Sequence, residues 1–144
     1  MKKNLLFISV LVIIFSSCKK DSSEAEDCPV TVASISGTYK LTSLQYKATS
    51  SSTMEDWYAQ VVEDCKKDDL YVLAANGDFN ILDMGTVCQQ SGSFQGIWTM
   101  ENNYINMDGF YAGSVDSYNC TTLVFSQTDA LVDGDNLKAT FVKQ

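Results

Sequence analysis

The chain of 144 residues contains no histidine and no arginine, so all ten of its basic residues are lysines. Without histidine, no side chain titrates near neutral pH at its ordinary pKa, and no Ser-His or Cys-His pair is available for nucleophilic catalysis. The absence of arginine, together with a net charge of −8, argues against binding nucleic acid, whose phosphates require cationic partners. We therefore expect neither an enzyme with catalytic residues nor a nucleic-acid-binding protein.

One apolar run dominates the N-terminus: residues 5–15, interrupted only at Ser9, follow the basic start Met1-Lys2-Lys3. This run is too short to cross a bilayer, which takes roughly 20 residues, but it suits the apolar core of a signal peptide. It ends in Phe15-Ser16-Ser17-Cys18, which resembles the lipobox of bacterial lipoproteins, where the cysteine is lipidated and becomes the first mature residue. The alternative is an ordinary secretory signal with a chance cysteine.

These features divide the chain into a lipoprotein signal peptide at 1–17, a lipidated Cys18 with a flexible tether at 18–30, and a folded domain at 31–144. Residues 19–27 lack aromatic and branched apolar side chains, so they cannot compensate the entropy of ordering. By resemblance to lipoproteins, an aspartate after Cys18 would retain the protein at the inner membrane, but the residue here is Lys19. We therefore expect a protein of the bacterial cell envelope, held in the outer membrane by its lipid. The sequence identifies neither the membrane face nor a protein partner.

Short apolar runs separated by turn residues fill the rest of the chain. The clearest hairpin signal is Asn76-Gly77, because a two-residue type I′ turn needs two residues with positive φ. Such a turn pairs Ala74 with Phe79 and Val72 with Ile81. One face of the ribbon then carries Leu70, Val72, Ala74, Phe79 and Ile81. An apolar face of this kind predicts an antiparallel sheet with one side buried.

A second ribbon, 94–107, has its predicted turn at Asn102-Asn103, which pairs Met100 with Ile105 and Trp98 with Met107. Segment 35–46 reads as a strand whose apolar phase slips after Leu41, which indicates a bulge. Further strands are predicted at 110–118, 121–126 and 136–142. Eight strands in consecutive hairpins favour an all-β, antiparallel up-and-down barrel, a fold that removes exposed sheet edges.

One short helix is predicted between the first two strands. Ser52 precedes Glu55 by three residues, as in a capping box, and apolar residues then recur at helical spacing. This stripe comprises Met54, Trp57, Tyr58, Val61, Val62 and Cys65. A lone amphipathic helix usually covers a sheet, and the alternative is a lid over a ligand.

Four stretches along the chain carry a family resemblance. They are Gly37-Thr38-Tyr39-Lys40-Leu41, Cys65-Lys66-Lys67-Asp68-Asp69, Asn76-Gly77-Asp78-Phe79 and Gly96-Ile97-Trp98. Together they resemble the lipocalin-like domain of bacterial envelope lipoproteins over roughly 35–142, although the family's usual G-x-W is Gly37-Thr38-Tyr39 here. The resemblance implies an eight-stranded lipocalin-like barrel on a lipid anchor, usually without an assigned function.

Besides Cys18 there are four cysteines, and an even number in an exported chain predicts disulfides with three possible pairings. We favour Cys65–Cys88, which closes the base of the central hairpin, and Cys28–Cys120, which fixes the N-terminus to a late strand. A metal site is the rival, but the chain has no histidine and no C-x-x-C spacing. Residues 133–136, Asp-Gly-Asp-Asn, lack the bidentate glutamate of a calcium loop, so we expect a solvated turn there. No metal or other cofactor is predicted.

Two functions remain open. In the first, a small hydrophobic ligand lies at the barrel mouth against Trp57, Tyr58, Tyr39, Phe79, Trp98 and Phe125. In the second, the barrel is filled and the protein is a non-enzymatic structural or protein-interaction lipoprotein. An eight-stranded barrel is just wide enough either to be filled by side chains or to hold one small ligand, so the filling of the interior decides between them. The fold resemblance favours ligand binding.

Overall fold

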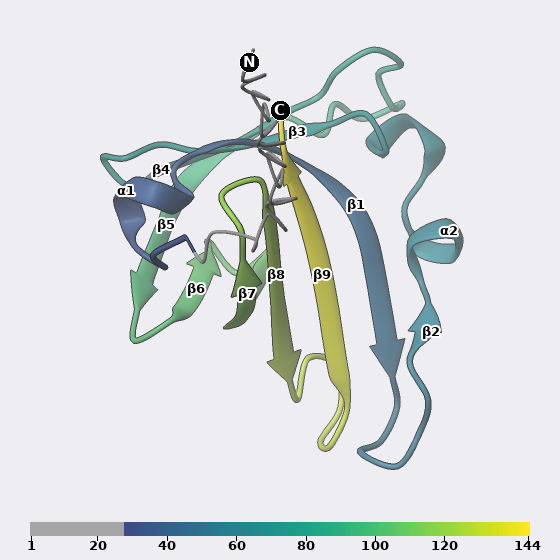
Figure 1. The fold of residues 1–144 in the computed structure, drawn as a ribbon. Coiled ribbons are helices and arrows are strands. Elements are labelled where there is room, and N and C mark those ends of the chain that lie inside the picture. Colours follow the sequence, from purple (N-terminus) through teal and green to yellow (C-terminus); the bar gives the residue numbers. More distant parts are fainter. Residues whose placement is uncertain (1–27) are drawn as a thin grey trace, which may run out of the picture.

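The computed structural model describes residues 28–144, which form an antiparallel sheet of nine strands with only short helices (Figure 1). Strand β1 pairs with both β3 and β9, so that β1 and β3 to β9 close into a ring of eight strands. The all-β prediction is therefore confirmed. The predicted signal peptide, the lipidation site Cys18 and residues 19–27 lie outside the described residues.

The strands follow the chain in order around the ring, each antiparallel to the next. Their bounds are β1 Gly37–Lys47, β2 Glu55–Asp56, β3 Leu70–Leu73, β4 Asp78–Leu82, β5 Phe94–Glu101, β6 Tyr104–Met107, β7 Tyr111–Tyr118, β8 Thr122–Thr128 and β9 Asn136–Lys143. In Figure 1 the long strands β1, β9 and β8 lie side by side, and β2 lies at the outer edge of β1.

Strand β1 contains the predicted bulge. Its register against β9 shifts between Leu41 and Ser43, and Leu41 and Leu44 are both buried although three positions separate them. Side chains alternate between the two faces of a strand, so residues three positions apart can face the same side only if a bulge adds one residue between them. The phase slip read from the sequence therefore predicts this bend correctly.

The β3–β4 hairpin differs from the prediction by one residue of register. Leu73, not Ala74, pairs with Phe79, and Tyr71 pairs with Ile81. The turn contains three residues, 75–77, and Gly77 has a φ of 93° whereas Asn76 has no positive φ. A one-residue slip exchanges the two faces of a strand. Tyr71 and Leu73 thus face the core in place of Leu70 and Val72.

The β5–β6 hairpin has the predicted register. Asn102 and Asn103 have φ values of 49° and 63°, as a two-residue type I′ turn requires. Met100 pairs with Ile105, and Trp98 pairs with Met107. The buried face of this hairpin carries Trp98, Ile105 and Met107.

The predicted helix after β1 is mostly wrong. Glu55–Asp56 forms strand β2 against β1, and the α-helix is reduced to the four residues of α2, Tyr58–Val61, followed by a 3-10 turn at Asp64–Lys66. Trp57 leaves the helical stripe and stacks on Tyr46 of β1, with ring centroids 3.9 Å apart. Sheet pairing and aromatic stacking therefore prevail over the local helical pattern.

A short helix that the sequence did not indicate covers one end of the ring. Helix α1, Val32–Ile35, is capped by Thr31 and Ser34, each of which accepts a hydrogen bond from the other's backbone N–H. The Tyr118 hydroxyl and the Lys143 ammonium both donate to Ser34 O, at 2.5 and 3.1 Å. We call this the closed end of the ring.

The described structure includes residues 28–30, which precede the predicted start of the folded domain at 31. Cys28, which the sequence assigned to the tether, is joined to Cys120 with 5.4 Å between their Cα atoms, and Val30 packs against the core. The disulfide therefore adds residues 28–30 to the structured region and holds the segment that leads into α1.

Large apolar side chains fill the interior of the ring. The buried set is Ile35, Tyr39, Leu41, Leu44, Tyr71, Leu73, Phe79, Ile81, Trp98, Ile105, Met107, Tyr118, Leu123, Phe125, Ala139 and Phe141. Within residues 28–144 no helix has the length and apolar character needed to cross a membrane.

Candidate binding cavity at the open end

The end of the ring opposite α1 is formed by the segments that lead into β3, join β4 to β5 and join β6 to β7. We call it the open end. A cavity of about 340 Å³ lies there, within the roughly 300–1,000 Å³ typical of small-molecule sites. It is lined by Lys66, Asp69, Tyr71, Ile81, Gly92, Phe110 and Tyr111.

The cavity continues into the aromatic core. Tyr71 and Tyr111 contact each other edge to face at 5.9 Å between ring centroids, and both contact the buried Phe141 in the same way. Phe110, which is 51% exposed, packs on Phe94 at 4.5 Å. The floor of the cavity is therefore packed and aromatic, and an accessible aromatic ring stands at its entrance.

Three carboxylates fix the β4–β5 segment, residues 83–93, over this end. Asp69 accepts a hydrogen bond from Met84 N at 3.3 Å, and Asp68 accepts one from Thr86 N at 3.3 Å. Asp83 accepts one from Gly92 N at 2.7 Å. Backbone N–H groups of the segment thus find acceptors on side chains, as segments without sheet partners require.

A disulfide fixes the same segment covalently. Cys65, in the 3-10 turn Asp64–Lys66, is joined to Cys88, with 5.4 Å between the Cα atoms. Both disulfides of the structure are the pairings that the sequence favours, one at each end of the ring.

Asp69 is the buried charged group of the cavity, with only 3% of its surface exposed. Burial raises the pKa of its carboxyl, and the neighbouring charges of Asp83 and Asp68 raise it further. The hydrogen bond from Met84 N and the Lys66 ammonium act in the opposite direction without cancelling the rise. Asp69 therefore carries its charge at an energetic cost and gains from any cationic or hydrogen-bond-donating partner.

The two tyrosines of the cavity are neutral. Burial raises the pKa of Tyr71 and of Tyr111 above the ordinary value, so both hydroxyls keep their protons at physiological pH. They offer hydrogen bonds and aromatic surface to a bound molecule, but no charge.

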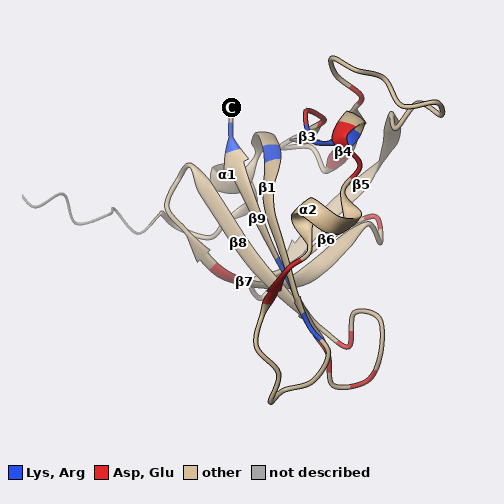
Figure 2. Ribbon diagram, turned by 90° about the vertical axis from the view of Figure 1, so that its right-hand side faces the viewer, with Lys and Arg blue, Asp and Glu red and all other residues tan. Residues whose placement is uncertain are grey.

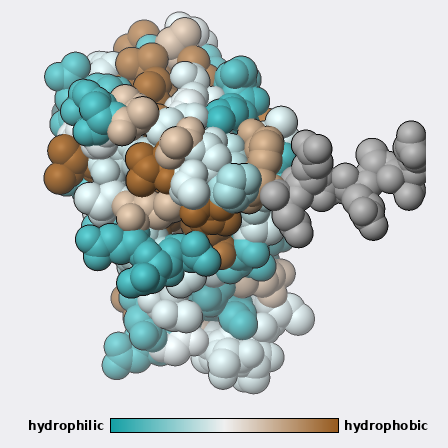
Figure 3. Space-filling model, turned by 60° about the vertical axis from the view of Figure 1, so that its left-hand side comes forward, coloured by the Kyte–Doolittle hydropathy of each residue, from teal (hydrophilic) through white to brown (hydrophobic). Residues whose placement is uncertain are grey.

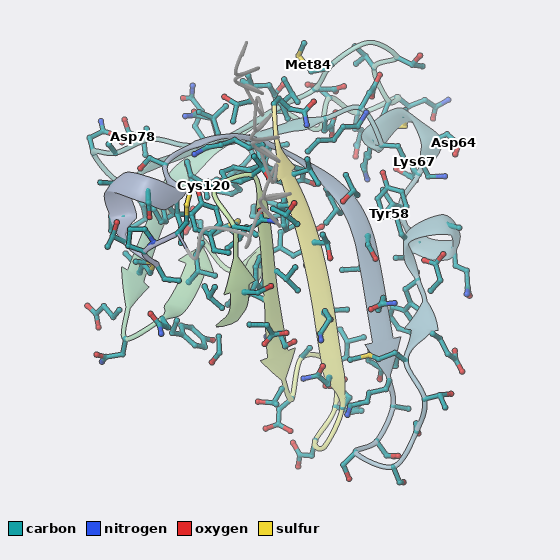
Figure 4. All side chains as sticks on the ribbon, viewed as in Figure 1. Tyr58, Asp64, Lys67, Asp78, Met84 and Cys120 are labelled. Atoms are coloured by element: carbon teal, nitrogen blue, oxygen red, sulfur yellow. A yellow bond between two sulfur atoms is a disulfide. The ribbon has the colours of Figure 1, made fainter. Side chains whose placement is uncertain are left out.

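Charged residues lie close together in the segments beside β3 and β4 (Figure 2). Lys66 forms an ion pair with Glu63 at 2.7 Å, and Lys67 forms one with Asp64 at 2.6 Å. The Lys67 ammonium also lies 5.9 Å from the centre of the Tyr58 ring, and Figure 4 shows Tyr58, Asp64 and Lys67 close together beside α2. Both lysines of this region are thus already paired with carboxylates.

None of the six ligand-contacting residues predicted from the sequence lines this cavity. Four of them, Tyr39, Phe79, Trp98 and Phe125, are at most 3% exposed and belong to the core. The Tyr39 hydroxyl donates to Ile35 O at 2.5 Å, and the Trp98 indole donates to Ala74 O at 2.8 Å. These contacts explain why polar aromatic residues are tolerated inside the ring.

The remaining two, Trp57 and Tyr58, are partly buried beside β1. The sequence analysis therefore missed all seven lining residues, among them Asp69, Tyr71, Phe110 and Tyr111. A signal was available in β3, because inward-facing Tyr71 and Leu73 would have placed a tyrosine at the ring end, but the predicted register assigned that face to Leu70 and Val72.

The β8–β9 loop is built differently from the predicted solvated turn. Asp135 is 2% exposed, and its carboxylate accepts hydrogen bonds from the backbone N–H groups of Ala130, Leu131 and Val132 at 2.6, 2.9 and 3.0 Å. Burial raises the pKa of Asp135, but these bonds and the Tyr46 hydroxyl prevail and lower it. The prediction of a solvated turn is therefore wrong for Asp135, whose oxygens organise the loop.

Comparison of the chain with protein-family models, with curated proteins and with solved structures finds no match.

Proposed function

We propose that this chain is a lipid-anchored protein of the bacterial envelope whose eight-stranded ring is a lipocalin-like barrel that holds a small, largely apolar molecule at its open end. The observation that carries the proposal is the cavity of about 340 Å³ between Tyr71, Phe110 and Tyr111. The leader sequence that ends at Cys18 supports the localisation in the cell envelope. The lipid anchor itself would contribute about 0.8 kcal/mol of membrane binding for each buried CH₂ group.

The difference between the two ends of the ring supports a binding role. At the closed end, Ser34 of α1 accepts hydrogen bonds from Tyr118 and Lys143, and the cavity there has no buried carboxylate among the described residues of its wall. At the open end, a partly exposed ring and a buried carboxylate face a cavity. Convergent aromatic surface with one well-placed polar group is typical of small-molecule sites.

The second candidate is a protein-interaction lipoprotein, and the filled interior favours it. Phe79, Phe125 and Phe141 are at most 2% exposed, so a ligand cannot pass deep into the ring. An interaction protein of this kind should also present a continuous apolar surface. On the face over α1, β5 and β6, however, the apolar atoms form separate patches between polar ones (Figure 3).

Native mass spectrometry tests the proposal on a secreted form that begins at Ser22, purified without detergent. A carrier retains an additional mass that disappears on denaturation, and less of the same mass is retained by a Tyr111→Trp variant whose larger side chain narrows the cavity. The matched control is Tyr104→Trp, since Tyr104 is 46% exposed on the outside of β6. A clean mass for the unmodified chain, with no uptake of added fatty acids, haem or sterols, contradicts the proposal and supports the interaction protein.

A further inference from the structure

Asp69 has a carboxylate oxygen without a donor in the described part of the chain. Its Oδ1 accepts from Met84 N, whereas Oδ2 receives no hydrogen bond from the described residues and lies on the side of Gly92, another residue of the cavity wall. A Cβ at Gly92 would approach this oxygen to 3.3 Å, so the glycine leaves it accessible to a small group. A buried carboxylate in this position favours a partner that donates hydrogen bonds or carries positive charge.

The charges around the cavity have one predominant sign. Residues 63–69 together with Asp83 supply five carboxylates and two lysines. Both lysines form ion pairs with Glu63 and Asp64, and no described ion pair joins a lysine to Asp68, Asp69 or Asp83. Oxygens of Asp68 and Asp83 are also buried without a hydrogen-bond partner among the described residues. The local potential therefore attracts cations.

The aromatic walls favour the same sign of charge. Phe110 and Tyr111 stand on the cavity wall beside Tyr71, and the faces of aromatic rings attract ammonium groups through their quadrupole. Because Tyr71 and Tyr111 stay protonated, they add no negative charge of their own. An aromatic wall with one carboxylate is therefore suited to an organic cation with an apolar body.

A metal ion fits this end less well. Among the described residues, the one group that brings three potential metal-ligating atoms within 4.8 Å of one another is Glu63, Cys65 and Cys88, and its two sulfurs form a disulfide. Asp68, Asp69 and Asp83 do not converge in this way. The three carboxylates hold the β4–β5 segment through backbone donors instead.

We propose that the open-end cavity binds a small organic cation, with its ammonium group against Asp69 and its apolar body against Tyr71, Phe110 and Tyr111. This assignment rests on the proposed carrier function, since it names the chemical class of the molecule carried.

Three probes of similar size and different charge test the assignment: 2-phenylethylammonium, neutral 2-phenylethanol and 3-phenylpropionate. Their binding to the full chain, purified in an uncharged maltoside detergent, is measured by isothermal titration calorimetry at pH 7. We expect the ammonium probe to bind about tenfold more tightly than the alcohol, because a charge-assisted hydrogen bond is stronger than a neutral one. The carboxylate probe should bind weakest.

Two variants test whether Asp69 causes the preference for the ammonium probe. Asp69→Asn should reduce the affinity for 2-phenylethylammonium to that for the alcohol, whereas the control Asp133→Asn, at an exposed position of the β8–β9 loop, should change neither. Lys66→Met removes the nearest competing cation and should strengthen binding of the ammonium probe. This second variant keeps the test valid even where Asp69→Asn impairs folding, which near-ultraviolet circular dichroism reports.

The outcomes separate the two proposals. Binding of the alcohol as tightly as the ammonium, with both weakened in Tyr111→Trp, overturns the cation assignment and leaves the carrier function standing. Absence of binding for all three probes at millimolar concentration overturns the cation assignment alone if native mass spectrometry still shows a retained mass, and overturns both proposals if it does not. A preference for the ammonium that survives in Asp69→Asn and is unchanged in Lys66→Met overturns the role of Asp69.

Discussion

Each end of the ring has a disulfide and buried polar groups, but the two ends differ in how many of those polar groups have hydrogen-bond partners. At the closed end, the hydroxyls of Tyr39 and Tyr118 and the Lys143 ammonium all donate to carbonyls of α1 at 2.5 to 3.1 Å. At the open end, within the described part of the chain, Asp69 Oδ2 accepts no hydrogen bond, and buried oxygens of Asp68 and Asp83 have no hydrogen-bond partner. The closed end, where these polar groups have hydrogen-bond partners, serves stability. The open end, where some carboxylate oxygens lack partners among the described residues, is the end that we assign to binding.

The largest expected effect comes from removing the disulfide of the closed end. Cys28 and Cys120 are 92 residues apart, and loop-closure entropy then predicts that Cys28→Ala/Cys120→Ala lowers the free energy of unfolding by about 4 to 5 kcal/mol. Urea unfolding followed by tryptophan fluorescence measures the loss. The cavity residues lie at the other end of the ring and should be unaffected. Ligand affinity should therefore persist in the folded fraction. Loss of affinity without loss of stability would contradict the division between the ends.

Removing the disulfide of the open end should cost less and affect binding more. Cys65 and Cys88 enclose a separation of 23 residues, so Cys65→Ala/Cys88→Ala should lower the free energy of unfolding by about 3 kcal/mol. The β4–β5 segment then depends on the weak hydrogen bonds from Met84 and Thr86, both at 3.3 Å. Hydrogen exchange should show faster exchange of the amides of 83–93, and the probe affinities should fall. Unchanged exchange in this segment would show that the aspartates alone hold it.

A single hydroxyl provides a finer test of the closed end. Tyr118→Phe removes the hydroxyl that donates to Ser34 O and Cys120 O and accepts from Lys143, but it leaves the bond from Lys143 to Ser34 O. We expect a loss of about 0.5–1.5 kcal/mol in unfolding free energy. The matched change at the open end is Tyr111→Phe, which should alter stability less, because the side-chain partner of this hydroxyl is Tyr71, itself a residue of the cavity wall. Equal losses in the two variants, measured by thermal unfolding, would remove the distinction.

The smallest and most specific effect concerns pH. The pKa of Asp69 is raised in the folded state, so the folded protein binds its proton more tightly than the unfolded chain, and stability falls as the pH rises from the unfolded to the folded pKa. Asp69→Asn should therefore raise the melting temperature slightly at pH 7, and the gain should vanish at pH 3.

Asp135 provides the control with the opposite sign. Its pKa is lowered in the folded state, so its stabilising contribution is present above the unfolded pKa and is lost as the pH falls through the folded pKa. Asp135→Asn should lower the melting temperature at pH 7. If both substitutions shift stability in the same direction at pH 7, the assignment of one strained and one satisfied carboxylate is wrong.

The strand register could be predicted from the sequence where the turn residues allowed only one turn type. Asn102 and Asn103 both adopt positive φ, so the register of β5 and β6 followed from the turn alone. In the β3–β4 hairpin only Gly77 has positive φ, and the turn lengthens to three residues. The gain is burial of Tyr71 and Leu73, which are larger together than the Leu70 and Val72 pair assigned from the pattern. Packing across the ring decides this register, and packing is not visible in a local window.

The site was harder to predict than the fold for the same reason. Asp69 and Gly92 meet only because the β4–β5 segment folds back over the start of β3. The helical stripe from Met54 to Cys65 was equally misleading, because Trp57 gains more from stacking on Tyr46 than from continuing a helix. Local patterns therefore identified strands, bulge and disulfides, whereas the cavity depends on contacts between distant segments.

The position of the Cys28–Cys120 bond has a mechanical consequence. Tension applied to the chain ahead of Cys28 passes through the sulfur atoms to Cys120 and enters the sheet between β7 and β8. Residues 29–36, including α1, lie outside that load path. A protein held by its N-terminus can thus be pulled without unseating α1, and the hydrogen bonds that seal the closed end carry no force until the strands themselves separate.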